Sequence, residues 1–187
     1  MSDAVPAWAH ERAEVLPYDP HWAARASKER EQLTDLLGPW LVGPVEHVGS
    51  TAVRGLAAKP IIDLAASVDD LDAVAARNVQ DLAANGWHYV PPELDGRPWR
   101  RFFVKPDASG RYREAHLHLI ETGHPRWNAQ IAFRDALRSD DEVARRYEDL
   151  KHELSHRHGD DREAYTHGKA AFVAGVLSDS AHPDPTD

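Results

Sequence analysis

Residues 61–68 form an apolar run that contains one carboxylate, Asp63. A short apolar run between turn residues is typical of a buried β-strand. An unpaired carboxylate inside such a strand would cost several kcal/mol, so Asp63 requires a cationic partner. That partner is either a metal ion or a basic side chain, such as Lys59 or an arginine. The run therefore predicts a sheet that carries a charged site.

The elements around this strand follow from periodicity, caps and turn residues. In chain order we expect a helix at 19–37, strands at 45–48 and 61–68, a helix between 69 and 86, strands at 87–90, 100–105 and 113–121, and helices at 127–138, 141–158 and 161–177. This order predicts an α+β (mixed α/β) fold, with one mixed sheet flanked by helices and a C-terminal helical layer. We place a single domain at 18–177, after an N-terminal extension at 1–17 and before a disordered tail at 178–187.

Composition excludes several classes of protein. The chain has 22 Lys and Arg against 31 Asp and Glu, a formal charge of −9, which argues against sequence-independent nucleic-acid binding but allows a local basic pocket. It has no cysteine, which excludes disulfides, thiolate zinc sites and cysteine nucleophiles. No apolar run approaches the roughly 20 residues of a membrane span, and no export signal is visible. We therefore expect a cytoplasmic protein that does not enter a membrane.

A turn after the strand at 45–48 carries Gly49, Ser50 and Thr51. Glycine lets the backbone approach a ligand closely, and free N–H groups at such a turn attract anions, while the two hydroxyls can bind oxygen atoms. Lys59 adds a point charge suited to a phosphate. With Asp63 on the next strand, this arrangement predicts a phosphate–metal site. A plain loop with a structural salt bridge is the alternative.

The 18 residues 46–63, EHVGSTAVRGLAAKPIID, resemble the signature of the GrpB family. The similarity continues in RFFVK at 101–105, in Arg113 with HLH at 116–118, in FRDALR at 133–138, in Tyr147 with Leu150-Lys151, and in Tyr165 and Lys169. It covers roughly residues 18–172. The resemblance implies the nucleotidyltransferase (polymerase-beta-like) fold. The family also occurs fused to dephospho-coenzyme A kinase, which suggests a link to coenzyme A metabolism.

The resemblance also implies roles for single residues. In nucleotidyltransferases a Gly-Ser turn holds phosphates, and a carboxylate pair on the next strand holds two metal ions with a third carboxylate from a later strand. Gly49 and Ser50 match the turn, and Asp63 matches the first carboxylate. The second position is Ala65, so the pair is broken. Two-metal chemistry of the usual kind is therefore in doubt.

His116 and His118 stand where the third carboxylate is expected. They share one face of their strand, because side chains alternate along a strand. With Asp63 they form a candidate catalytic group, as metal ligands or as an acid–base pair, and histidines bonded to backbone at the core edge are the alternative. The expected ion is Mg²⁺, Mn²⁺ or Zn²⁺, of which imidazole suits the last two better. Glu46 is a further candidate metal ligand.

Four basic residues are candidates for an anion pocket, since arginine binds phosphate or carboxylate with two hydrogen bonds. They are Arg101, Lys105, Arg113 and Arg134. Arg134 precedes Asp135, and an ion pair on a helix surface explains it equally well. Trp99 is a candidate stacking platform for a base or substrate.

A second metal motif, His152-Glu153-x-x-His156, matches the H-E-x-x-H pattern of zinc peptidases. The third ligand of the longer motif would fall at Arg162, which cannot bind zinc. The spacing of this helix instead predicts an inward apolar stripe, so peptidase function is a remote alternative.

These features predict a protein that binds a nucleoside triphosphate or a similar phosphorylated ligand, together with a divalent metal ion. Its reaction would be metal-assisted nucleotidyl or phosphoryl transfer, or ATP-dependent activation of a small-molecule acceptor. The alternative is a non-catalytic module that senses a nucleotide or coenzyme A.

Overall fold

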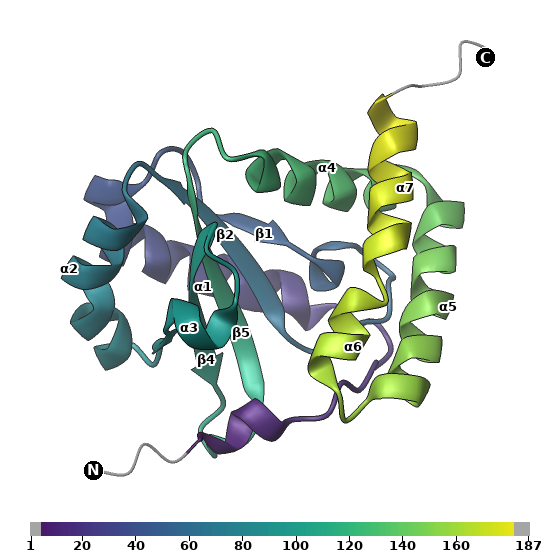
Figure 1. Ribbon diagram of the computed structural model, residues 1–187, viewed down its shortest axis with the longest axis horizontal. Helices are drawn as coiled ribbons and strands as arrows, with labels where there is room; N and C mark the ends of the chain where they lie inside the picture. The colour runs from purple at the N-terminus through teal and green to yellow at the C-terminus, as the bar shows by residue number, and fades with distance from the viewer. Residues whose placement is uncertain (1–4, 182–187) are drawn as a thin grey trace.

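The computed structural model describes residues 5–181. One mixed five-stranded sheet runs through it in the order β1-β2-β5-β4-β3 (Figure 1). The strands are β1 (Glu46–Val48), β2 (Ile62–Val68), β3 (His88–Val90), β4 (Arg100–Pro106) and β5 (Arg113–Glu121). β2 and β5 are parallel, and the other neighbouring strands pair antiparallel. The predicted mixed sheet is confirmed.

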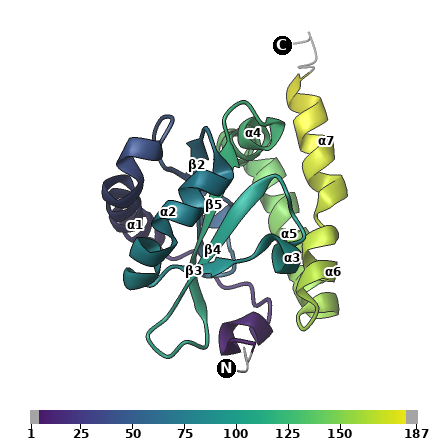
Figure 2. The same ribbon diagram turned by 60° about the vertical axis from the view of Figure 1, so that its left-hand side comes forward.

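Helices form a layer on each side of the sheet. They are α1 (His21–Leu37), α2 (Leu71–Ala84), α3 (Pro92–Asp95), α4 (Pro125–Ser139), α5 (Asp141–His158), α6 (Arg162–His167) and α7 (Ala170–Ala181). In Figure 2, α1 and α2 lie on one side of the sheet, and α4 to α7 lie on the other. Residues 161–177, predicted as one helix, form two, because the chain breaks around Gly168, which lies so close to Leu154 that a side chain there would collide.

Alternate residues of the strands face the two helical layers. The face under α1 and α2 is apolar, and Leu64 and Leu117 lie fully buried there in the main core cluster. Asp63, His116 and His118 are one step out of phase with these leucines, so they lie on the opposite face. We call this the pocket face. The apolar core thus fixes which strand residues reach the site.

The two ends of the chain also bear on the site. Leu16 forms a β-bridge with Ala58, and the Ala13 N–H donates to the Gly159 carbonyl at 2.8 Å, so the predicted N-terminal extension lies against the domain. Residues 178–181, predicted as part of a disordered tail, belong to α7, and 182–187 lie outside the described residues. Within the described part of the chain, no helix is long and apolar enough to cross a membrane.

Candidate functional site

A pocket of about 380 Å³ opens on the pocket face, beside the turn at Gly49. It is bounded by β2, β4 and β5, by α3, α5 and α6, and by the N-terminal segment. Seven Lys and Arg residues line it against three carboxylates, Asp63, Asp95 and Glu163, although the whole chain has a formal charge of −9. Such a concentration of positive charge favours an anionic ligand.

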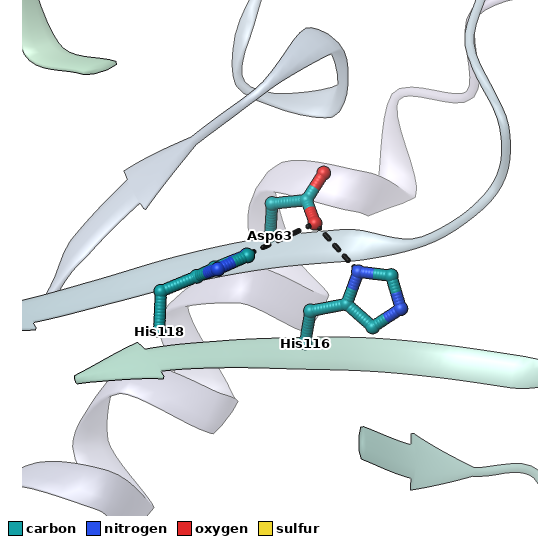
Figure 3. Close-up of side chains that lie close together, drawn as sticks. All are labelled: Asp63, His116 and His118. Carbon is teal, nitrogen blue, oxygen red and sulfur yellow. Dashed lines mark hydrogen bonds and ion pairs between the residues drawn. The ribbon is translucent and has the colours of Figure 1, made fainter. Parts of the chain in front are cut away.

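Asp63 of β2 lies beside His116 and His118 of β5 (Figure 3). His116 Nδ1 lies 2.8 Å and His118 Nε2 lies 3.6 Å from the same oxygen, Oδ1 of Asp63. Burial would raise the pKa of Asp63, but hydrogen bonds from the two imidazoles hold that pKa well below its usual value. Asp63 is therefore ionised, with 31% of its side chain exposed.

A fixed arginine sets the protonation of His118. Arg100 donates from Nη1 to His118 Nδ1, and two hydrogen bonds of 2.8 and 2.5 Å hold Arg100 on the Asp95 carboxylate. Because a guanidinium only donates, His118 Nδ1 must accept, and the proton of the neutral ring lies on Nε2, toward Asp63. Burial and the nearby charge of Arg100 lower the pKa of His118, which favours this neutral ring.

His116 also turns an N–H toward Asp63. Burial lowers the pKa of His116 to about 3 in spite of the hydrogen bond with Asp63, so the ring is neutral at pH 7. Its Nδ1 donates to the ionised carboxylate, and its buried Nε2 has no hydrogen-bond partner among the described residues. Oδ1 of Asp63 therefore faces two imidazole N–H groups.

Asp63, His116 and His118 form the one cluster of metal-binding type within residues 5–181, and their donor atoms lie within 4.8 Å of one another. Asp63 and His116 fit a divalent ion, since a carboxylate oxygen and an imidazole suit Mn²⁺ or Zn²⁺. His118 does not fit while Arg100 donates to its Nδ1. A metal at Nε2 would move the proton to Nδ1, directly against the guanidinium. The structure thus reduces the predicted ligands to two.

Ala65 stands where the resemblance places the second carboxylate of a two-metal site, and it is completely buried. Its cluster is apolar: Val48, Ile120, Trp99, Trp127 and Ile131. Glu46, which lies opposite Ala65 in the sheet and is a predicted metal ligand, is held by Arg134 of α4 at 2.7 Å. Glu46 therefore does not join Asp63, which corrects its prediction.

The turn at Gly49 brings the backbone close to Asp63. Gly49 has a φ of +72°, and a Cβ there would lie 2.6 Å from Asp63 Oδ2, so a side chain is excluded. The buried Thr51 hydroxyl donates to the Ile61 carbonyl at 3.1 Å and is used inside the protein. Ser50 also lines the pocket, where its side chain forms a hydrogen bond with Tyr147.

Two of the predicted basic residues lie on the face of the sheet opposite the pocket. Arg101 and Lys105 lie on the face of α1 and α2, where Arg101 pairs with Asp72 at 2.6 Å and Lys105 pairs with Glu29 at 2.8 Å. This corrects their prediction as pocket residues. Because side chains alternate along β4, it is Arg100 that reaches the pocket.

Among the other predicted basic residues, Lys59 and Arg113 line the pocket. Arg134 lies outside it, because Glu46 at 2.7 Å and Asp135 at 2.8 Å hold its guanidinium on α4. The surface-pair explanation of Arg134 is therefore the closer one, although the residue itself is buried.

Five cations of the pocket are missed by sequence reasoning: Arg97, Arg100, Lys151, Arg162 and Lys169. Lys151 and Lys169 belong to segments that resemble the GrpB family, which is the one signal that could have found them. Arg100 required the register of β4 against β5. Arg97 and Arg162 reach the pocket from a loop and from α6, and nothing in their local sequence marks them.

The H-E-x-x-H residues of α5 lie on the surface. His152, Glu153 and His156 are exposed, and Glu153 pairs with Arg157 at 2.8 Å. The buried residues of α5 are Tyr147, Lys151 and Leu154. None of these three residues belongs to the possible metal-binding cluster found within residues 5–181. The described residues therefore give the peptidase alternative no metal site.

The chain is similar to a family of known proteins. A family model described as GrpB protein matches residues 12–179. UPF0157 protein PA4798 of Pseudomonas aeruginosa is 39% identical over 170 residues, which cover 89% of this chain and 67% of that protein. UPF0157 protein YqkA of Bacillus subtilis is 35% identical over 162 residues, which cover 87% of this chain. The chain spans 45% of the length of YqkA.

A solved structure has the same architecture. The crystal structure of conserved protein GrpB from Enterococcus faecalis superposes with a TM-score of 0.77 and 29% sequence identity. The match covers 89% of this chain and 96% of that one. The family model covers most of the chain, and the solved relative shares its fold over nearly the same length. The chain belongs to the GrpB family.

Proposed function

We propose that the pocket binds a phosphorylated small molecule, a nucleoside triphosphate or a close relative, and supports metal-assisted nucleotidyl or phosphoryl transfer to a small acceptor. One observation carries this proposal. Seven Lys and Arg residues outnumber three carboxylates in a pocket that opens beside a glycine turn, and the pKa of one of these carboxylates, Asp63, is held well below its usual value. Cations are suited to the phosphates, and the aspartate is suited to a divalent ion that accompanies them.

The residues divide this work between them. The backbone at Gly49 and the Ser50 hydroxyl would bind phosphate oxygens, together with Lys59 and Arg113. Asp63 and His116 would hold the divalent ion. When bound, such an ion neutralises charge that develops on the transferred phosphoryl group. His118 would orient Asp63 through its Nε2–H.

Binding without turnover is the second candidate, and one observation favours it. The position of the second carboxylate is filled by Ala65 and closed by apolar packing, so the two-metal arrangement is absent from the described residues. A nucleotide or coenzyme A would still meet the same cations, since both carry phosphates. The proposed link to coenzyme A metabolism belongs to this candidate.

Thermal unfolding of the metal-stripped protein tests both candidates. The panel is four nucleoside triphosphates and coenzyme A, each with and without Mg²⁺, Mn²⁺ or Zn²⁺. A ligand at 100 times its Kd should stabilise the protein by about 2.7 kcal/mol. At about 2–4 °C per kcal/mol for this size, the midpoint should rise by roughly 5–10 °C.

Asp63→Asn separates the outcomes. A metal-dependent shift that this variant loses supports transfer, and the nucleotide that gives it is the donor for an acceptor screen. A shift that needs no metal and survives in the variant supports the binding module. No shift with any of the five ligands would overturn the proposal.

A further inference from the structure

Two lysines of the pocket approach the same aromatic ring. The geometry points to a diphosphate clamp formed by Lys59 and Lys169 over Tyr165, which binds two adjacent phosphates of the ligand without a metal ion. This inference rests on the proposed function, because it names the part of the ligand that the pocket holds and the residues that hold it.

The distances to the ring set an upper limit on the gap between the two ammonium groups. The Nζ atoms of Lys59 and Lys169 lie 4.7 and 4.6 Å from the centroid of the Tyr165 ring. They are therefore separated by no more than these two distances combined. A diphosphate with charge-assisted hydrogen bonds of about 2.8 Å at each end can span a gap up to this limit. A single phosphate is too short to bind both ammonium groups when the gap is close to the limit.

The fold holds the residues of the clamp in place. Tyr165 is 1% exposed, so its ring cannot move away from the lysines. Lys59 follows Ala58, which is tied to Leu16 by a β-bridge. Lys169 lies in the break between α6 and α7, next to Gly168, so the break delivers this side chain to the pocket.

Neither ammonium is neutralised by the protein. In the part of the chain that the structure describes, no carboxylate lies within ion-pair distance of Lys59 or Lys169. The neighbouring cations Arg113 and Arg162 share one carboxylate, Glu11, at 4.0 and 3.9 Å. Both lysines are partly buried. A partly buried charge without an ion-pair partner costs free energy, and a bound anion lowers that cost.

The pKa values agree with this picture. Burial, reinforced by the charge of Lys169, lowers the pKa of Lys59 to about 7. Burial lowers the pKa of Lys169 to about 8, with Asp63 opposing the change and Arg162 adding to it. Both groups would recover their ordinary affinity for protons once a polyanion lies between them.

The third lysine of the pocket differs from these two. Lys151 is 2% exposed, and its Nζ donates to the Ala57 carbonyl. It therefore anchors the loop that leads to Lys59 and is not open to a ligand. The chain has five lysines, and Lys28 on the exposed side of α1 offers a matched control.

Calorimetric titration of the full chain in a metal chelator tests the clamp, with orthophosphate, pyrophosphate and tripolyphosphate as probes. We expect pyrophosphate and tripolyphosphate to bind at least tenfold more tightly than orthophosphate. Lys59→Met and Lys169→Met should each weaken pyrophosphate binding at least tenfold, whereas Lys28→Met should leave it unchanged. Lys169→Arg, which keeps the charge, should stay within about threefold of the unmodified protein.

The outcomes separate this inference from the proposed function. If pyrophosphate binds but both methionine variants retain its affinity, the clamp is wrong and the proposed function stands. If pyrophosphate binds only when a divalent ion is added, a metal-free clamp is likewise wrong. If neither phosphates nor nucleotides bind with or without metal, both fail. Circular dichroism establishes that each variant is folded, and the other methionine variant tests the clamp if one of them is not.

Discussion

The pocket face contains two sectors that differ sharply although the same strands build both. The charged sector consists of Asp63, His116 and His118, which face a pocket lined by cations. The apolar sector begins two residues further along the same strands, at Ala65 and Ile120, neither of which has exposed surface. Its other members are Val48, Trp99, Trp127 and Ile131.

This difference concerns Ala65, the position where the resemblance places a second carboxylate. Ala65 is not an empty place that a neighbouring acid fills, because tryptophan and isoleucine side chains have closed around it. The Asp63 end of the strands faces the pocket, whereas Ala65 has no exposed surface, and the ion pair of Glu46 with Arg134 lies beside Ala65 on the same face. Any chemistry of this protein must therefore proceed with one carboxylate on β2.

The largest expected effect comes from Ala65→Asp, which would break the comparison by placing charge in the apolar sector. The packing around Ala65 is apolar, and the nearby guanidinium of Arg134 is already paired with Glu46 and Asp135. The free energy of unfolding should therefore fall by about 3–5 kcal/mol. Urea denaturation measures this change. Ala24→Asp on the exposed side of α1 is the control and should stay within about 0.5 kcal/mol. A stable Ala65→Asp protein that gains Mg²⁺-dependent nucleotide binding would show that the two sectors are interchangeable.

The sequence reveals the two sectors unequally. The carboxylate of Asp63 inside an apolar run indicates the charged sector. The alternation of side chains along a strand correctly places His116 and His118 on one face. The closure around Ala65 is invisible to it, because the tryptophans come from distant loops and from α4. The prediction of Arg101 instead of Arg100 as a pocket residue is wrong for another reason. A shift of one residue along a strand moves a side chain to the other face of the sheet.

The next largest effect concerns His118, the member of the charged sector that cannot bind a metal. In the double variant Arg100→Met, Asp95→Asn, Nδ1 of His118 no longer faces a donor, so Nε2 can offer its lone pair. Affinity for Co²⁺ or Zn²⁺ should rise about 10- to 100-fold, the size that partners of metal-bound histidines typically control. The visible absorption of bound Co²⁺ reports the change.

Arg101→Met is the matched control for this experiment, because Arg101 is the next residue of β4 and faces α2. Its metal affinity should equal that of the unmodified protein. Nitrogen NMR of His118 gives an independent readout, with the proton on Nε2 before the substitution. Equal metal affinity in the double variant and in the control would remove Arg100 from this role.

The pH dependence of stability sharpens the contrast, since Lys59 and Lys169 line the pocket beside the charged sector. The lowered pKa values of Lys59 and Lys169, about 7 and 8, mean that the unfolded chain binds more protons than the folded one between these values and about 10.4. Stability should therefore rise with pH from about 7 to 10, by at most about 1.4 kcal/mol per pH unit for each lysine. The other charges that act on the pair are Glu11, Asp63, Arg97, Arg113, Lys151 and Arg162.

Urea midpoints between pH 7 and 9.5 measure this rise, and Lys169→Met should reduce its slope. Saturating tripolyphosphate should reduce it, because clamped lysines keep their protons, whereas Lys151, whose pKa burial also lowers to about 7, is not open to the ligand. A slope that is the same in Lys169→Met as in the unmodified protein would assign the rise to other groups.

The smallest expected effect tests where the two sectors meet. Trp99 stacks on His124 at 6.1 Å and lies over the guanidinium of Arg100 at 5.4 Å, but it does not line the pocket. Trp99→Phe keeps an apolar ring in the cluster, so stability should fall by about 0.5–1 kcal/mol and nucleotide affinity should change less than about twofold. Trp127→Phe, in the same sector, is the control. A loss of nucleotide affinity above tenfold with Trp99→Phe alone would make this ring a stacking platform, and the boundary would then lie beyond Trp99 instead of between it and Arg100.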